Sequence, residues 1–66
     1  MAEILETAVK QICSKNGNDR TRMMDIVREV QDRFGQVSGQ AMNTIAQAVN
    51  SHRVEVESVV SFYSFL

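Results

Sequence analysis

Two side chains could supply a nucleophile or a soft metal ligand: Cys13 is the only cysteine and His52 is the only histidine. Cys13 lies beside Ile12 on an apolar helix face, where desolvation raises a thiol pKa, so we expect a buried and unreactive side chain. His52 stands between Ser51 and Arg53 in a polar connection, without further ligand-type residues at helical spacing. A Cys–His pair would also need an orienting group, and none is identifiable. We therefore predict no catalytic, cofactor-binding or metal-binding residue in this chain.

Two other kinds of site that occur in small helical proteins, a calcium-binding loop and a phosphopantetheine attachment site, do not fit this sequence. The run NGND at residues 16–19 offers oxygen ligands around a glycine, as a calcium loop does. Placing Gly17 at the sixth loop position puts Ile12 at the first, where a carboxylate is required. A carrier protein with a phosphopantetheine arm would need Asp-Ser-Leu at a helix start, and the sequence lacks it. The alternating charges of residues 25–33 indicate a solvated helix face.

Length and charge restrict the function further. Sixty-six residues make one domain, and a chain of this size buries only about 60% of its unfolded surface, which leaves little room for a catalytic cleft. Seven basic and eight acidic residues give a net charge of −1, too balanced to indicate a nucleic-acid or membrane partner. No secretory signal is present, and the terminal apolar run is far shorter than the ~20 residues of a membrane span. We expect a soluble, cytoplasmic protein without membrane insertion.

Apolar periodicity predicts two amphipathic helices before residue 36. The first carries a stripe of apolar residues and a Glu6–Lys10 pair, and it ends in the turn KNGND at residues 15–19. Asp19 or Thr21 is expected to cap the second helix, and Gly35 to end it. The first stripe is Ile4, Leu5, Ala8, Val9, Ile12 and Cys13. The second is Met23, Met24, Val27, Val30, Gln31 and Phe34, with Ile26 at its edge and a Glu29–Arg33 pair opposite.

A third helix is expected between Ser38, as its cap, and Asn50, which tolerates the left-handed conformation that ends helices. Its apolar side holds Ala41, Met42, Ile45, Ala46 and Val49. The second and third helices could form a helix-turn-helix module, with Gln36, Ser38, Gln40 and Asn43 available to contact base edges. The third helix, however, carries no Lys or Arg for phosphate contacts, so we predict no nucleic-acid partner.

The closing stretch, VEVESVVSFYSFL, is ambiguous on periodicity alone. Val56, Val59, Val60, Tyr63 and Leu66 fit a helix, while Val54, Val56, Val60 and Phe62 fit a strand nearly as well. Because a single strand in a helical chain has no partner, we predict a fourth helix capped by Ser51. The expected fold is therefore all-α, a small bundle of four short helices. Phe62, Tyr63, Phe65 and Leu66 either complete its core or face a partner, which makes them the candidate interface residues.

The order of these motifs resembles a known family. Gln31-Asp32-Arg33-Phe34-Gly35 is one mark, and the valine-rich segment from Glu55-Val56 into Phe62-Tyr63-Ser64 is the more specific one. The chain is similar to the N-terminal helical domain of the thioredoxin-like [2Fe–2S] ferredoxin subunit, of the 24-kilodalton type, of NADH:quinone oxidoreductase. Related NAD(P)-linked iron-only hydrogenases and formate dehydrogenases carry the same module. The family often has proline where this sequence has Ser38 and His52, a mild change at helix starts.

The resemblance implies a helical final segment and a role in docking and assembly. In the family, the matching segment leads into a thioredoxin-like domain whose four cysteines bind a [2Fe–2S] cluster, and FMN and NAD(P) belong to a partner subunit. We expect residues 1–66 to be the N-terminal helical domain of a longer subunit, holding no cofactor and catalysing no reaction itself. We expect Val59, Val60, Phe62 and Tyr63 to be buried against the other helices, which would fix the position at which the chain leaves the bundle toward the next domain. An autonomous, self-associating helical domain remains the other possibility.

Overall fold

The computed structural model describes the backbone of residues 2–64 and the side chains of residues 5–63. Within this range the elements are α1 (Ala2–Lys15), a 3-10 turn η1 (Arg20–Arg22), α2 (Met23–Phe34), α3 (Gly39–Ala48) and α4 (Arg53–Ser64). Residues 2–64 contain no strand, so the predicted all-α bundle of four short helices is confirmed, as is the helical final segment. The side chain of Ile4 and all of Phe65 and Leu66 lie outside the described residues.

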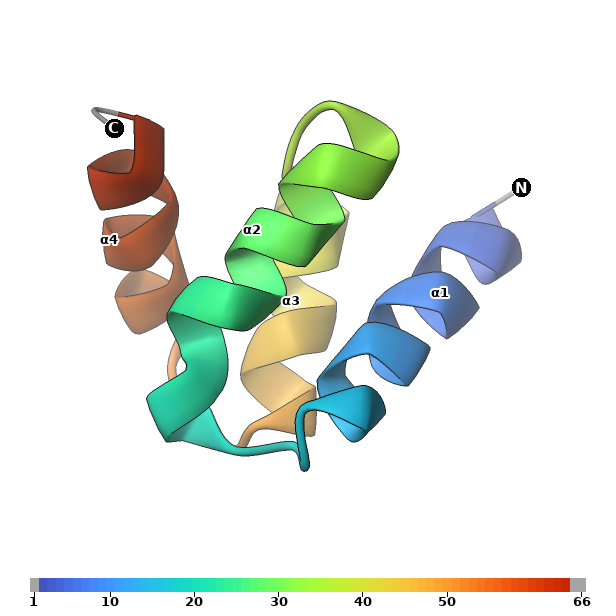
Figure 1. The fold of residues 1–66 in the computed structure, drawn as a ribbon, viewed down its shortest axis with the longest axis horizontal. Helices are drawn as coiled ribbons and strands as arrows, with labels where there is room; N and C mark the ends of the chain where they lie inside the picture. Colours follow the sequence, from blue (N-terminus) through green and yellow to red (C-terminus); the bar gives the residue numbers. More distant parts are fainter. Residues whose placement is uncertain (1, 65–66) are drawn as a thin grey trace.

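The two central helices, α2 and α3, are covered on opposite sides by α1 and α4 (Figure 1). Helix α1 packs mainly on α3 and also on α2, whereas α4 packs on both α2 and α3. Each outer helix therefore turns one side to the bundle and leaves the other side uncovered. This arrangement decides which apolar residues of α4 are buried and which are open to a partner.

The helices end as the turn residues require. Gly35 has φ +80°, and its N–H donates to the Gln31 carbonyl at 2.8 Å, which confirms it as the end of α2. Asn50, with φ +57°, follows α3, and the next N–H, of Ser51, donates back to the Ala46 carbonyl at 2.8 Å. This i+5 bond satisfies a carbonyl that the helix would otherwise leave open, so the predicted role of Asn50 is confirmed.

The predicted helix starts are confirmed for α3 and wrong for α4. The Ser38 hydroxyl accepts from the Ala41 N–H at 3.2 Å, as expected of an N-cap. Helix α4 begins one residue later than predicted, since the His52 carbonyl accepts from the N–H groups of Glu55 and Val56. The Ser51 hydroxyl instead donates to the Glu55 carboxylate, so it supports the first turn through a side chain rather than by capping a backbone N–H.

Asp19 does cap, but it caps the short turn η1 rather than α2 directly. Its carboxylate accepts from the Thr21 N–H. Helix α2 then begins at Met23, and the Arg22 side chain, at the N-cap position, makes no capping hydrogen bond. The predicted Glu29–Arg33 pair is replaced by a contact between helices: Lys15 Nζ lies 2.6 Å from Glu29 Oε2. The tertiary packing of α1 on α2 supplies the nearer cation.

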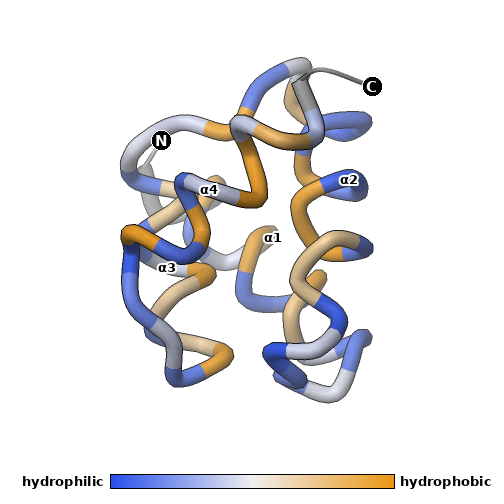
Figure 2. The backbone as a smooth tube through the Cα atoms, turned by 90° about the vertical axis from the view of Figure 1, so that its left-hand side faces the viewer, coloured by the Kyte–Doolittle hydropathy of each residue, from blue (hydrophilic) through white to orange (hydrophobic). Residues whose placement is uncertain are grey.

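The core combines one apolar side of each helix. Ile26 was predicted at the edge of the α2 stripe but is 0% exposed, as fully buried as Val27 and Val30, whereas Phe34 is 37% exposed. Figure 2 shows the hydrophobic positions of α2 turned toward the other helices and its hydrophilic positions turned outward. Thr44 is buried too, and its hydroxyl donates to the Gln40 carbonyl at 3.0 Å. The largest fully buried side chains are Ile12, Ile26, Ile45, Val9, Val27, Val30, Val56 and Cys13.

In the described part of the chain, no helix has the length and apolar character needed to cross a membrane.

Candidate interaction surface

Cys13 is fully enclosed by the core. It is 0% exposed, and burial raises the pKa of its thiol because the interior disfavours the thiolate. Thiolate is the form that attacks electrophiles and binds metal ions. The predicted buried thiol is therefore confirmed, and Cys13 has neither the access nor the ionisation for nucleophilic chemistry.

The polar residues near the turns have structural partners. The Asp19 carboxylate accepts from the Thr21 N–H at 2.9 Å and from the Thr21 hydroxyl at 2.8 Å, and these bonds lower the pKa of Asp19. His52 is exposed just before α4. Among the described residues, no three His, Cys, Asp or Glu side chains converge as they do at a metal site. The bonds between Asp19 and Thr21 therefore stabilise the turn before α2.

The surface of the described residues includes a hollow between α1 and α3 and another along α2, both shallow. One of about 330 Å³ lies between α1 and α3, where Lys10, Ser14 and Thr44 are among its lining residues. Lys10 is already paired with Glu6 at 3.2 Å, and the Thr44 hydroxyl is bonded to its own helix. The other hollow, of about 320 Å³, lies along the charged side of α2. Neither presents a buried, convergent group that would orient a small ligand.

The most unusual surface is the side of α4 that faces away from the bundle. Val54 is 71% exposed and Phe62 is 56% exposed, and Ser58 lies between them at a spacing of four residues on either side. Residues four apart occupy the same side of a helix, so these three side chains form one stripe. We call Val54, Ser58 and Phe62 the outer face of α4.

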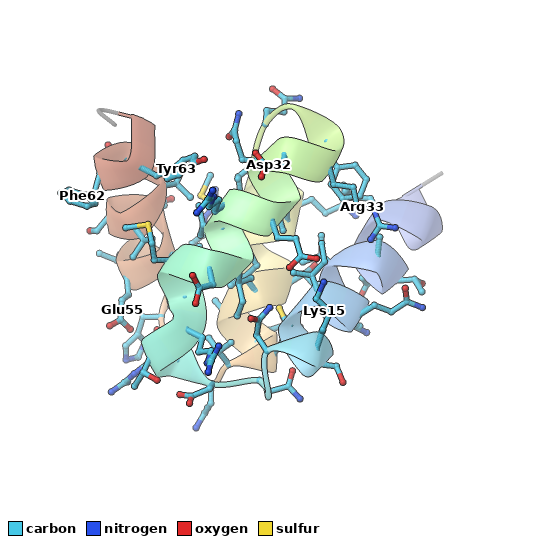
Figure 3. The ribbon with its side chains drawn as sticks, in the orientation of Figure 1. Lys15, Asp32, Arg33, Glu55, Phe62 and Tyr63 are labelled. Carbon is cyan, nitrogen blue, oxygen red and sulfur yellow. The ribbon has the colours of Figure 1, made fainter. Side chains whose placement is uncertain are left out.

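The opposite side of α4 is bound to the core. Val56 is 0% exposed, and Val59, Val60 and Tyr63 are partly buried against the core cluster. Figure 3 shows the Tyr63 side chain directed toward α2 and the Phe62 side chain directed away from the other helices. The expectation that both rings would be buried is therefore wrong for Phe62, because consecutive helix residues point about 100° apart. Of the candidate interface residues, Phe62 faces outward, Tyr63 joins the core, and Phe65 and Leu66 lie outside the described residues.

Polar contacts hold α4 in this orientation. Arg53 donates from Nε to Glu57 at 2.9 Å and from Nη1 to Asn43 of α3 at 3.3 Å, so it connects α4 to its neighbour. The Ser58 hydroxyl donates to the Val54 carbonyl of its own helix at 3.0 Å. With that bond made, the outer face presents a valine, a small side chain and a phenylalanine, which suits an apolar partner surface.

The sequence pattern did not single out Val54. A strand would have put Val54 and Val56 on the same side, whereas the helix turns them to nearly opposite sides. Only the packing of α4 on α2 and α3 determines which of the two is buried. The signal that could have located Val54 was the helical period counted outward from Phe62.

Helix α3 exposes amide side chains and no cation. Its exposed residues include Gln40, Asn43 and Gln47, and its sequence, GQAMNTIAQA, contains no Lys or Arg. The Asn43 amide already accepts a bond from Arg53. A recognition helix without cations on its exposed side lacks the phosphate contacts from which such modules take most of their affinity.

Residues 9–66 match the family model described as thioredoxin-like [2Fe–2S] ferredoxin, which confirms the resemblance inferred from the motifs. The match extends from within α1 to the last residue and so includes the whole of α2, α3 and α4. No curated protein and no solved structure gives a match.

Proposed function

Because the chain belongs to the thioredoxin-like [2Fe–2S] ferredoxin family, we propose that it is the non-catalytic docking domain of an electron-transfer subunit. The subunit would work in an NAD(P)H-linked oxidoreductase of the NADH dehydrogenase or hydrogenase type. The observation that carries this proposal is the family match over residues 9–66 in a chain whose only thiol is buried. We place the subunit in the cytoplasm, where a lone thiol such as Cys13 stays reduced.

The residues present do not fit the cluster for which the family is named. A [2Fe–2S] cluster is held by four cysteine thiolates, or by two when two histidines replace the others. This chain has one cysteine and one histidine. Cys13 is closed off inside the core, and His52 lies at the exposed start of α4. We therefore assign the cluster to a thioredoxin-like domain of the same subunit, and FMN and NAD(P) to a partner subunit.

The docking role rests on the contrast between the two sides of α4. Its inner side, with Val56 fully buried, fixes the helix to the bundle, while Phe62 keeps more than half of its surface exposed. An exposed aromatic ring on a rigid helix is the kind of anchor that dominates protein interfaces. In this proposal Phe62, together with Phe65 and Leu66, contacts the cluster-bearing domain or the flavin-binding subunit, while Tyr63 stays packed on the core.

The first test is the coding DNA beyond the Leu66 codon. An in-frame continuation that encodes four cysteines would support the proposal, because it would supply the cluster ligands that this chain lacks. An in-frame stop codon would count against a continuous subunit. The docking proposal would then require the cluster-bearing protein to be a separate chain that binds this one.

The second test measures binding to the partners. The 66-residue chain would be titrated into the purified cluster-bearing domain and into the flavin-binding subunit by calorimetry. We expect Phe62→Glu to weaken the interaction strongly, since it puts a carboxylate into an apolar contact. Gln47→Glu adds the same group to an exposed position of α3 and serves as the matched control. Equal binding by the two variants, or no binding by the unmodified chain, would refute the docking role.

A helix-turn-helix nucleic-acid function is one of the two alternatives from the sequence, and no feature of α3 favours it. The test is fluorescence anisotropy with random duplex DNA at low salt, where cationic contacts are strongest. We expect no binding by the 66-residue chain. Salt-dependent binding that is lost on substituting Gln40 or Asn43 would favour the helix-turn-helix function instead.

A further inference from the structure

We propose that the outer face of α4 binds a second copy of the same chain, with the two α4 helices antiparallel and a two-fold axis beside Ser58. This inference does not depend on the proposed docking function. It rests on the side-chain pattern, the local hydrogen bonds and the charge distribution of α4.

The pattern is symmetric about its centre. Val54 and Phe62 each lie four residues from Ser58, one toward either end of the helix. In an antiparallel pair centred on Ser58, Val54 of one copy lies level with Phe62 of the other, at both ends of the contact. A two-fold interface requires one surface to be complementary to itself, and this stripe meets that requirement. A parallel pair would instead set the two large rings side by side and leave a gap at the two valines.

The centre of the stripe allows close approach. Ser58 is small, and its hydroxyl is already bonded to the Val54 carbonyl at 3.0 Å. It would therefore enter the contact without leaving an unsatisfied donor. Small side chains at a helix crossing let the two backbones come close, so that Val54 and Phe62 on each side can pack between the helices.

The charges of α4 favour the antiparallel arrangement. Arg53, Glu55 and Glu57 all lie in the first half of the helix, whereas residues 58–64 carry no charge. A parallel pair would bring Glu55 and Glu57 beside the same residues of the other copy, which is repulsive. An antiparallel pair sets each charged half against an uncharged half and also opposes the two helix dipoles.

The size of the face indicates a weak dimer. Helix α4 spans 12 residues, and the outer face occupies one side of about three turns. A contact of this size falls below the roughly 1,200 Å² of standard stable interfaces. We therefore expect monomers and dimers to exchange, with dimers appearing as the protein concentration rises from about 10 μM toward about 1 mM.

Cysteine cross-linking tests both the contact and its direction. The unmodified chain is a suitable background, because Cys13 is fully buried. Under mild oxidation we expect Ser58→Cys to form a disulfide-linked dimer at least about tenfold faster than Gln47→Cys, an exposed control on α3. Val54→Cys and Phe62→Cys should link poorly alone and efficiently when mixed. Equal rates for Ser58→Cys and Gln47→Cys would overturn the proposal, and so would efficient linking of Val54→Cys or Phe62→Cys with itself.

Sedimentation equilibrium supplies the matching measurement on the unlinked protein. We expect the apparent mass of the 66-residue chain to rise with concentration. Ser58→Glu should weaken this association about tenfold or more by forcing a carboxylate into the contact, with Gln47→Glu as control. A mass that stays monomeric up to about 1 mM would refute self-association. If that chain still bound the cluster-bearing domain through Phe62, only the proposed function would survive; a dimer without such binding would leave only this inference.

Discussion

Two valines in α4 offer a direct test of its orientation. Val56 is 0% exposed and Val54 is 71% exposed, although they are two residues apart on the same helix. Substituting each with alanine removes the same atoms and gives the same gain in helix propensity, about 0.5 kcal/mol. The difference between the two variants therefore isolates burial, because the other contributions cancel.

The expected difference follows from the exposures. At Val56, losing two buried methyl groups costs about 1.6 kcal/mol of transfer free energy. The cavity that remains after incomplete collapse of the surrounding side chains adds about 0.5 kcal/mol more. At Val54 only about a third of the transfer term applies, roughly 0.5 kcal/mol, which the gain in helix propensity offsets. We thus expect Val56→Ala to lower the free energy of unfolding by about 1.5–2 kcal/mol more than Val54→Ala does.

The assay is urea unfolding followed by circular dichroism at 222 nm, with a thermal melt of each variant. A domain of this size is expected to have only about 3–10 kcal/mol of stability. The Val56 variant should therefore melt about 10 °C below the Val54 variant. Protein at about 10 μM keeps the weak dimer from contributing. Equal losses, or a larger loss at Val54, would show that α4 is rotated relative to the bundle and would refute the assignment of its outer face.

Three further outcomes are expected. Tyr63→Ala should lower the melting temperature clearly because Tyr63 packs on the core. Phe62→Ala should change the melting temperature little because Phe62 is 56% exposed. A larger loss for Phe62→Ala than for Tyr63→Ala in a thermal melt would contradict the positions of the two rings. Cys13 should react slowly with a thiol reagent in the native chain and completely in denaturant, since it is enclosed and its thiol pKa is raised. The reaction is measured by absorbance, and rapid labelling of the native chain would contradict this expectation. Hydrogen bonds from Thr21 lower the pKa of Asp19 in the folded state, so its contribution to stability is present above about pH 4 and lost as the pH falls through the lowered value. Carboxyl NMR titration should show this low pKa in the unmodified chain. Thr21→Val should return the pKa only partly toward the ordinary value, because it removes the hydroxyl bond and keeps the larger contribution of the Thr21 backbone N–H. An ordinary Asp19 pKa in the unmodified chain would contradict the assignment.

Much of this molecule follows from local sequence. The apolar period of 3.6 residues defines the first three helices, while the fourth followed from the lack of a partner for a single strand and from the family resemblance. Gly35 and Asn50 end two of the helices because the left-handed conformation suits glycine and asparagine. Ser38 caps α3 because its hydroxyl reaches an N–H that the helix leaves free. A single cysteine excludes a four-thiolate cluster within the chain regardless of how it folds. The family, too, was identifiable from the motif at residues 31–35 and the valine-rich segment leading to Phe62 and Tyr63.

The tertiary structure decided what periodicity leaves open. Ile26 is fully buried because α2 has neighbours on more than one side, which broadens its buried stripe. Glu29 pairs with Lys15 because α1 brings a cation closer than its own helix does. The two sides of α4 are both rich in apolar residues, so the sequence alone could not assign Val54 and Phe62 to solvent. Packing on α2 and α3 assigned them by burying Val56 and Tyr63, since a helix can turn only one side to the bundle.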